Sequence, residues 1–367
     1  MTDRLRVGIV GASADGQGWA PISHFPALRT LPGFEIAAIC TAHADTAAAA
    51  AKVYGVKRAF HDYHTMVQEP DIDLVSVVVR VPNHHQVVMA ALNAGKHVYC
   101  EWPLGANLAD AEEMAALARS KGVRAMVGLQ ARGDPTLRYF HDLIADGYVG
   151  EVVAVNMTLF TAGVLERPAS RLWDRDKTQG VSALTVRGIH SMDTLCHCLG
   201  EFVEVSAKVA TQVKQWRVSE TGAMVDVDAA DNVLVNGVLE GGALASIHVA
   251  TLPYHTTGWR MEIYGRGGTL RVSTKGSLQR DANTLQGSQG REPMAVLPVP
   301  GHYTEVPAET PLGPPNNVGH MYLRMAKAIR DGTPVEPDFD VGVNRHRLIE
   351  AIQRSSDEGR IVKLRST

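Results

Sequence analysis

The chain has few cysteines, a small net charge and no long apolar run, and each of these shortages excludes a class of protein. Its 367 residues include four cysteines, too few for a disulfide framework at this length. The 36 lysines and arginines nearly balance 39 acidic residues, which argues against a partner such as nucleic acid or a membrane surface bound through bulk charge. No window of about 18 residues is apolar throughout, so we expect no membrane-spanning helix.

The first residues run directly into a strand pattern, with no basic segment followed by an apolar stretch. We therefore expect no secretory signal. The length suggests two domains and a core large enough to fold without disulfides. Together these features predict a globular protein of the cytoplasm.

The first third of the chain alternates strand patterns with helix patterns. Strands are expected at residues 5–10, 34–40, 73–79, 96–100 and 125–129, and helices at 45–54, 83–94 and 107–120. Strand runs that are apolar on both faces are typical of buried parallel strands. The alternation predicts a doubly wound parallel sheet, which binds its ligands at the carboxyl ends of the strands.

Three glycines, Gly11, Gly16 and Gly18, follow the first strand. A strand, a glycine loop and a helix form the layout of a dinucleotide phosphate site, where the backbone approaches the pyrophosphate at the helix N-terminus. The spacing is not the usual G-x-G-x-x-G, and Pro21 and Pro26 predict a short or kinked helix. From the loop alone, a phosphate site and an ordinary glycine-rich turn are equally supported.

The residues after the second strand bear on the choice of cofactor. An NAD site usually has a carboxylate there, bonded to the ribose 2′-hydroxyl. This chain has Thr41 and His43 and no acid between them. Both side chains could bond a 2′-phosphate, which favours NADP over NAD, although they could equally be plain loop residues.

Motifs between residues 82 and 104 resemble those of the glucose–fructose oxidoreductase, inositol dehydrogenase and rhizopine-catabolism family, written Gfo/Idh/MocA. The motifs are Pro82-Asn83, the run ALNAGKHV at 91–98 and Glu101-Trp102-Pro103-Leu104. Farther on, GIHSMD at 188–193 resembles the Gly-x-His-x-x-Asp segment of the family. The resemblance implies an α/β Rossmann domain (1–125) and an α+β domain (126–367) with a large, mostly antiparallel open sheet. It also implies a homo-oligomer, a dimer or a tetramer.

Two positions depart from the family pattern. The lysine of its Glu-Lys-Pro motif, which contacts the nicotinamide ribose and the reacting oxygen, is Trp102 in this chain. The aspartate four residues before the motif histidine is Val186. Trp102 and the residues at 16–20 and 129–132 resemble a sub-branch that includes the fungal galactose-pathway repressors, which bind a dinucleotide but act as regulators.

Beyond residue 151 the strand patterns follow one another without helices between them. They lie at 152–160, 203–213, 231–238, 243–251, 259–264 and 269–272. This order predicts an antiparallel sheet in the second domain. Residues 277–315 are rich in glycine, proline and amide side chains and are expected to form loops, followed by helices at 318–330 and 342–358.

The candidates for catalysis are His190 and Asp193, three residues apart in an expected helix at 186–199. A histidine near its free pKa can accept the proton of an alcohol, and a carboxylate can hold the histidine ring or bond the substrate. The indole of Trp102 only donates hydrogen bonds, so His190 would carry more of this task than in a lysine-bearing relative. The alternative is a histidine that only packs in the core.

The remaining assignments follow from the strand ends and the resemblance. The residues expected at the cofactor are Gly11, Ser13, Gly16, Gly18, Trp19, Thr41, His43, Pro82, Asn83, His84, Glu101, Trp102 and Gln130. Those expected at the substrate are Trp102, Arg132, Arg187 and His190. No metal is expected, because neighbouring side chains of Cys196-His197-Cys198 point apart on a helix.

The sequence thus predicts an oxidoreductase that moves a hydride between NAD or NADP and a sugar, a polyol or a related alcohol. Two alternatives stay open. One is a non-catalytic regulator that binds a dinucleotide and a protein partner, which Trp102 and Val186 favour. The other is a lyase or hydrolase that recycles its nicotinamide in place, as some members of the family do.

Overall fold

The structure, a computed structural model, describes residues 4–364. They form two compact units. The first runs to Gly133 and takes in Glu305–Asn344, and the second covers Asp134–Thr304 and continues from Arg345. This division differs from the expected boundary after residue 125, because a late helix, α8 (Pro314–Asp331), supplies part of the core of the first unit.

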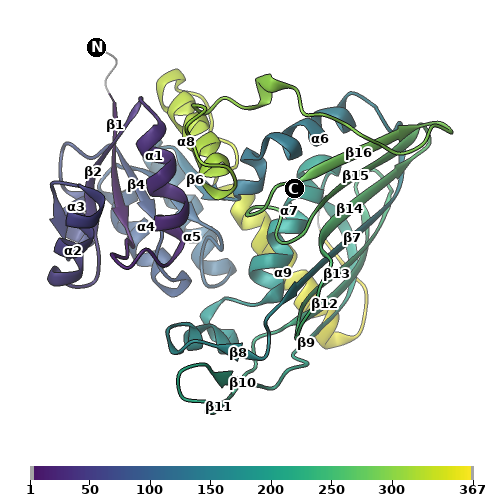
Figure 1. Cartoon of the computed structure of the whole chain (residues 1–367), viewed down its shortest axis with the longest axis horizontal. Helices are drawn as coiled ribbons and strands as arrows, with labels where there is room; N and C mark the ends of the chain where they lie inside the picture. Colours follow the sequence, from purple (N-terminus) through teal and green to yellow (C-terminus); the bar gives the residue numbers. More distant parts are fainter. Residues whose placement is uncertain (1–3, 365–367) are drawn as a thin grey trace. The chain divides into compact units, whose positions relative to one another are not determined.

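Within the described residues, the first unit contains a six-stranded parallel sheet in the order β3-β2-β1-β4-β5-β6 (Figure 1). The strands are β1 (Leu5–Val10), β2 (Phe34–Cys40), β3 (Ala59–Phe60), β4 (Leu74–Val77), β5 (His97–Glu101) and β6 (Ala125–Gly128). The order reverses between β1 and β4, which is the switch point where such sheets open a crevice for ligands. The predicted doubly wound parallel sheet is confirmed.

Helices cover both faces of this sheet. They are α1 (Phe25–Thr30), α2 (Ala44–Tyr54), α3 (Tyr63–Val67), α4 (His84–Asn93), α5 (Leu108–Lys121) and α8. Neighbouring residues of a strand point to opposite faces. In β1, Gly8 lies against Met66 of α3, whereas Ile9 belongs to the core cluster formed with α1 and α8.

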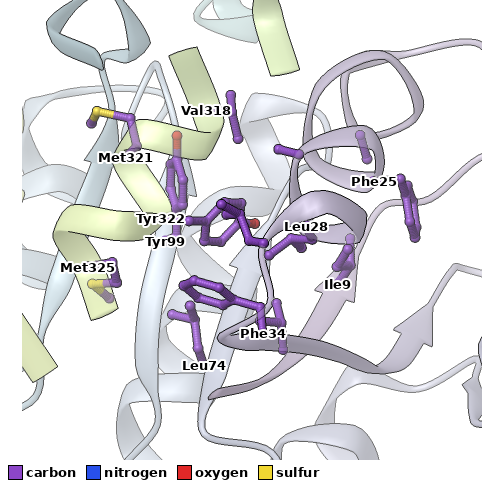
Figure 2. Close-up of a cluster of buried hydrophobic side chains, with 14 of the residues drawn as sticks. Ile9, Phe25, Leu28, Phe34, Leu74, Tyr99, Val318, Met321, Tyr322 and Met325 are labelled. Carbon is purple, nitrogen blue, oxygen red and sulfur yellow. The ribbon is translucent and has the colours of Figure 1, made fainter. Parts of the chain in front are cut away.

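The core between the sheet, α1 and α8 is closely packed (Figure 2). Leu28 of α1, Phe34 of β2 and Tyr99 of β5 belong to this cluster, and α8 adds Met321 and Tyr322. The ring of Phe34 meets that of Tyr322 edge to face with centroids 5.4 Å apart. The rings of Tyr99 and Tyr322 meet edge to face with centroids 5.1 Å apart. Burial of these side chains stabilises the unit by about 1.5–3 kcal/mol for each large apolar group, so α8 belongs energetically to the first unit.

Several element boundaries differ from the sequence prediction. Helix α2 begins at Ala44, one residue before the expected start, with His43 at its N-cap and Asp45 in its first turn. The expected helix at 83–94 opens with a 3-10 turn, Val81–Asn83, before α4. The short elements β3 and α3 were not predicted. The expected kink after the glycine loop is present as a π-helical turn, Ala20–His24, followed by α1.

Over the described residues, the second unit is built on a nine-stranded sheet in the order β17-β16-β15-β14-β7-β13-β12-β9-β18 (Figure 1). The strands are β7 (Val152–Ala162), β9 (Phe202–Ala210), β12 (Asn232–Leu239), β13 (Leu244–Leu252), β14 (Gly258–Gly265), β15 (Gly268–Thr274), β16 (Thr284–Gln289), β17 (Ala295–Val296) and β18 (Val362–Lys363). Neighbouring strands are antiparallel except for β13 and β7. The mostly antiparallel sheet is confirmed.

Helices of the second unit pack on this sheet. They are α6 (Pro135–Ala145), α7 (Ile189–Leu199) and the greater part of α9 (Phe339–Glu358). Strand β18 pairs only with the start of β9, which leaves amides farther along β9 without a strand partner. Hydroxyls of α9 accept from them instead, since the amides of Ala207 and Val209 donate to Ser355 at 3.0 Å and Ser356 at 2.8 Å.

The expectation of loops at 277–315 was wrong in part, because β16 and β17 lie there. Strand β16 buries Leu285 and Gly287, and the polar residues Gln286 and Ser288 that alternate with them are half-buried, so the strand has little apolar patterning in the sequence. Two other parts of the second unit were not predicted. They are α6 and a small sheet of β8 (Glu166–Arg167), β10 (Gln215–Val218) and β11 (Met224–Asp226).

Candidate functional site

The glycine loop that follows β1 is shaped by its glycines. Gly11 has a φ of 104°, and a Cβ there would lie 2.3 Å from the carbonyl oxygen of Val78. The loop backbone therefore passes too close to the end of β4 for any side chain at this position. Gly16 and Gly18 have φ values of 74° and 95°, which side chains rarely allow. The cradle fits a dinucleotide phosphate, for which backbone approach is the requirement.

One carboxylate, Asp15, organises the same loop. Its Oδ1 accepts from the hydroxyl of Ser13 at 2.5 Å and from the backbone amide of Gln17 at 2.8 Å. These bonds lower the pKa of Asp15, so the loop carries a negative charge at neutral pH. The hydroxyl of Ser13, expected at the cofactor, is bonded to Asp15 in this structure.

The residues at the tip of β2 lie near each other but bond locally. The hydroxyl of Thr41 donates to the carbonyl of His43 at 3.1 Å and is 2.6 Å from the hydroxyl of Thr46. The side chain of His43 is exposed and makes no capping bond to α2. The first carboxylate after the end of β2 is that of Asp45, which is exposed in the first turn of α2.

Glu101, at the end of β5, is the centre of a buried polar network. Its Oε1 is 2.9 Å from Nε2 of His24, and its Oε2 accepts from the amide of Gln130. Nδ1 of His24 is 2.7 Å from the hydroxyl of Tyr322, which is 2.7 Å from that of Ser76. Burial raises the pKa of Glu101, and the bonds from His24 and Gln130 oppose that effect.

This network joins residues that the motifs did not connect. Glu101 and Gln130 were expected at the cofactor, whereas His24, Ser76 and Tyr322 were not. His24 and Tyr322 are separated by 298 positions, so no local spacing could relate them. Oε1 of Gln130 is buried and has no hydrogen-bond partner within the described residues. A buried acceptor of this kind is available to a ligand.

His84 is the first residue of α4, and Trp102 follows the last residue of β5. Nδ1 of His84 is 2.8 Å from the carbonyl oxygen of Pro103, and its Nε2 is 3.1 Å from that of Val79. The ring therefore ties together the segments that leave β4 and β5, and burial lowers its pKa. Trp102 is 5% exposed in the free chain. Pro82 and Asn83 lie in the 3-10 turn just before His84.

Arg132, expected at the substrate, forms an ion pair with a residue of the first unit. It lies in a 3-10 turn, Gln130–Gly133, with its side chain 4% exposed and in an ion pair with Glu336. Its backbone carbonyl accepts from Arg324 of α8 at 2.7 Å. The guanidinium of Arg132 therefore neutralises the carboxylate of Glu336 in this structure.

His190 lies in the second unit, near the start of α7. The segment before it, Ala183–Gly188, is a π-helical turn capped by Ser182, so the expected helix at 186–199 is present but irregular at its start. His190 is 5% exposed, and its Nδ1 has no hydrogen-bond partner among residues 4–364. Burial lowers the pKa of His190 to about 4, Asp193 acts against this, and Arg280 adds to it. The imidazole is therefore neutral at pH 7.

Asp193 is directed to a residue that the sequence analysis missed. Its Oδ1 lies 3.6 Å from Nε of Arg345 in α9, and both side chains are 1% exposed. Arg345 also pairs with Glu201. The contact with Arg345 gives Asp193 a role in pairing α7 with α9.

Arg187 lines a cavity of about 370 Å³ that belongs wholly to the second unit. Val186, one of the two departures from the family pattern, lines it as well. Arg167, Arg171 and Arg280 also line it, and they were not predicted because no motif relates the segment at 167–171 to residue 280. His190 follows Arg187 by three positions, and the charge of Arg280 in the lining acts on the pKa of His190.

No group of three His, Cys, Asp or Glu side chains within residues 4–364 is arranged to hold a metal ion. No helix over the same residues is long and apolar enough to cross a bilayer.

Sequence comparison finds relatives over the whole chain. Dehydrogenase aclE of Aspergillus oryzae is 29% identical over 100% of both chains. The 1,5-anhydro-D-fructose reductase of Ensifer adhaerens is 28% identical over 80% of this chain and 83% of that one. The galactose/lactose metabolism regulatory protein GAL80 of Saccharomyces cerevisiae is 27% identical over 65% of this chain and 58% of its own length.

A solved structure agrees with these relatives. The NAD binding oxidoreductase from Klebsiella pneumoniae is 27% identical and superposes with a TM-score of 0.86 over 99% of this chain and 100% of its own. Residues 5–129 match the model of the family described as "Oxidoreductase family, NAD-binding Rossmann fold". Residues 141–364 match the model described as "Oxidoreductase family, C-terminal alpha/beta domain". The chain therefore belongs to the Gfo/Idh/MocA oxidoreductase family.

Proposed function

We propose that this chain is an NAD(P)-dependent oxidoreductase that acts on the hydroxyl-bearing carbon of a sugar, a polyol or a related alcohol. The observation that carries the proposal is the close approach of Gly11 to the carbonyl of Val78 in a loop of positive-φ glycines. The dehydrogenase and reductase relatives support the reaction class, and the name of the Ensifer adhaerens relative supports a sugar-like substrate.

The proposed cofactor site uses the first unit. The glycine loop would hold the pyrophosphate with its backbone, and Gln130 would offer its unpartnered Oε1. When bound, the nicotinamide accepts or returns the hydride. His84 would fix the two segments that leave β4 and β5, and Glu101 with His24 would keep the β5 end rigid.

His190 is the proposed proton acceptor. Its imidazole is neutral at pH 7, so it needs no prior deprotonation to take a proton from a substrate hydroxyl. The indole of Trp102 cannot accept that proton where relatives have lysine. Trp102 would instead offer an aromatic face to the nicotinamide or to a sugar ring.

The test follows reduced cofactor at pH 7–9 with NAD⁺ or NADP⁺ and a panel of sugars and polyols. Turnover by the wild type that falls at least 100-fold in His190→Ala, with cofactor binding unchanged, would support the proposal. His85→Ala is the matched control, since His85 lies on the outside of α4 and pairs with Glu113. Cofactor binding without turnover on any substrate would contradict it.

A non-catalytic regulator is the second candidate, and Trp102 is the observation that favours it. GAL80 is a relative with a regulatory name, and the lysine expected for catalysis is absent. Trp102→Lys separates the two candidates. An enzyme weakened by the departure should gain turnover with this substitution, whereas a regulator should gain none and should capture a protein partner only when cofactor is present.

Two finer properties are also proposed. The lack of a carboxylate at residues 41–43 favours NADP(H), which paired titrations with NADH and NADPH would test. Leu234 and Leu244 are 46% and 62% exposed on neighbouring strands β12 and β13, and such a sheet face suits a homo-oligomer. Light scattering of Leu234→Glu beside the wild type would test whether the assembly uses this face.

A further inference from the structure

The cavity of the second unit contains more positive charge than its own residues neutralise. Four arginines line it, Arg167, Arg171, Arg187 and Arg280, against two aspartates, Asp174 and Asp231. Charge of one sign is expensive to gather in a recess unless a ligand of the other sign enters it.

The two aspartates already have partners. Oδ2 of Asp174 accepts from Nη2 of Arg171 at 2.6 Å and from its Nε at 3.2 Å. Both oxygens of Asp231 accept from backbone amides, those of Gln212 at 2.8 Å and Val213 at 2.7 Å. Oδ1 of Asp174 is buried and has no hydrogen-bond partner within residues 4–364. The lining therefore holds four cationic side chains and two anionic ones, with Asp174 and Arg171 paired across it.

Arg187 is the arginine least satisfied by the protein. Its guanidinium offers five N–H donors but makes one hydrogen bond within residues 4–364, to the hydroxyl of Thr251 at 3.5 Å. Burial lowers the pKa of Arg187 to about 10, and the charges of Arg167, Arg171 and Arg280 act in the same direction. The chain thus holds a cation in a position that its neighbours disfavour, as binding sites often do.

The rest of the lining suits a hydroxylated molecule. The hydroxyl of Thr161 is buried and has no partner among the described residues, and Ser182 and Ser277 also line the cavity. Trp216 and Val164 supply apolar surface. A volume of about 370 Å³ lies at the lower end of the range of small-molecule sites, which matches a molecule the size of one sugar.

We propose that the substrate carries an oxyanion, a carboxylate or a phosphate, which this cavity binds through Arg187 and Arg280 while its hydroxyls bond Thr161. The identification of the occupant as the substrate rests on the proposed oxidoreductase function, but binding of the oxyanion does not. A planar guanidinium matches both oxyanions with paired hydrogen bonds, so the two share one recognition chemistry.

The cavity is also electrostatically linked to the candidate base. The charge of Arg280 lowers the pKa of His190, so the two groups influence each other across the unit. An oxyanion bound at Arg280 would offset that charge and raise the pKa of His190. Substrate binding would then strengthen the base that must receive its proton.

The experiment is calorimetry on the full chain without cofactor, using D-gluconate, D-glucose 6-phosphate and inorganic phosphate as probes and D-glucose as the neutral control. We expect at least one of the anions to bind at least tenfold more tightly than D-glucose, because charge-assisted hydrogen bonds are worth that much. Gluconate binding alone identifies a carboxylate, and binding of the two phosphates alone identifies a phosphate.

Variants decide whether the binding belongs to this cavity. Arg187→Gln and Arg280→Gln should each weaken anion binding at least tenfold, whereas Arg354→Gln, at an exposed arginine of α9 in the same unit, should not. Equal affinity for anions and D-glucose, or an equal loss in Arg354→Gln, would overturn the inference. Circular dichroism and the melting temperature identify a variant that fails to fold, and the other cavity variant then provides the comparison.

The outcome is separate from that of the proposed function. If the chain binds anions but no dinucleotide, the proposal of an oxidoreductase is contradicted and the proposal of an oxyanion site is supported. If the chain binds a dinucleotide and turns over neutral sugars but binds no anion, the proposal of an oxidoreductase is supported and this inference is overturned.

Discussion

Asp193 and Arg345 form an ion pair in the interior of the second unit, with Oδ1 and Nε 3.6 Å apart and both side chains 1% exposed. The pair joins α7, which carries His190, to α9. We expect this pair to position α7, whereas the spacing of Asp193 from His190 predicts a catalytic partner.

Replacement of Asp193 tests that role. Asp193→Asn leaves the buried charge of Arg345 with Glu201 as its main partner and should lower the free energy of unfolding by about 3 kcal/mol. Denaturant titration measures the loss. If Asp193 were a catalytic group alone, the variant would lose turnover with unchanged stability, and that result would contradict the positioning role.

His190 should make stability depend on pH. Its pKa is about 4 in the folded chain and about 6.5 when unfolded, so the unfolded state binds more protons as the pH falls through this interval. Folded-state stability should therefore be highest above pH 6.5 and fall by about 3 kcal/mol by pH 4.

The variant His190→Gln isolates this contribution. Urea titrations at pH 7, 5.5 and 4.5 should show a shallower loss of stability on acidification in the variant than in the wild type. His85→Gln, at a half-buried histidine on α4, serves as the control and should follow the wild type. Parallel curves for wild type and His190→Gln would mean that His190 is solvated and titrates near 6.5.

Replacing Gly11 or Gly16 of the glycine loop by alanine should lower the free energy of unfolding by different amounts. Gly11→Ala places a Cβ 2.3 Å from the carbonyl of Val78 at a φ of 104°, and should cost more than about 3 kcal/mol of folding free energy. Gly16→Ala meets open space at a φ of 74° and should cost about 1–2 kcal/mol. Thermal unfolding of the two variants measures this difference, and equal losses would show that the approach to Val78 relaxes easily.

Asp15 should weaken dinucleotide binding through its charge. Asp15→Asn keeps an oxygen that can accept from Ser13 and Gln17 and removes a negative charge from the loop. Affinity for the cofactor should rise about threefold at low salt, and the gain should shrink at 0.5 M salt because solvent ions screen exposed charges. A gain that is independent of salt would point to a change of loop conformation.

The parallel sheet was predictable because its longer strands are largely apolar over consecutive residues, whereas the two-residue strand β3 carries too short a signal to be found. The run LRVGIV at 5–10 and the run FEIAAIC at 34–40 give β1 and β2 with their observed bounds. Buried strands between helices leave little choice of fold. Strand β16 was missed because it alternates Leu285 and Gly287 with polar residues at a partly exposed part of the sheet.

The candidate site was predictable only where a motif is continuous. The glycine loop and the segment at 188–193 are contiguous in sequence, so they could be found. The pair of His24 with Tyr322 and the pair of Asp193 with Arg345 join residues that are far apart along the chain. Such partners are set by how helices such as α8 pack on the sheet, and a single sequence carries no local signal for them.

The most direct test of the whole account is a calorimetric titration of the wild type and Gly11→Ala with NAD⁺, NADH, NADP⁺ and NADPH. The glycine loop predicts saturable binding of at least one of the four by the wild type, and its loss in a folded Gly11→Ala. Absence of heat with all four, together with an unchanged melting temperature, would contradict the proposal of a dinucleotide at this loop.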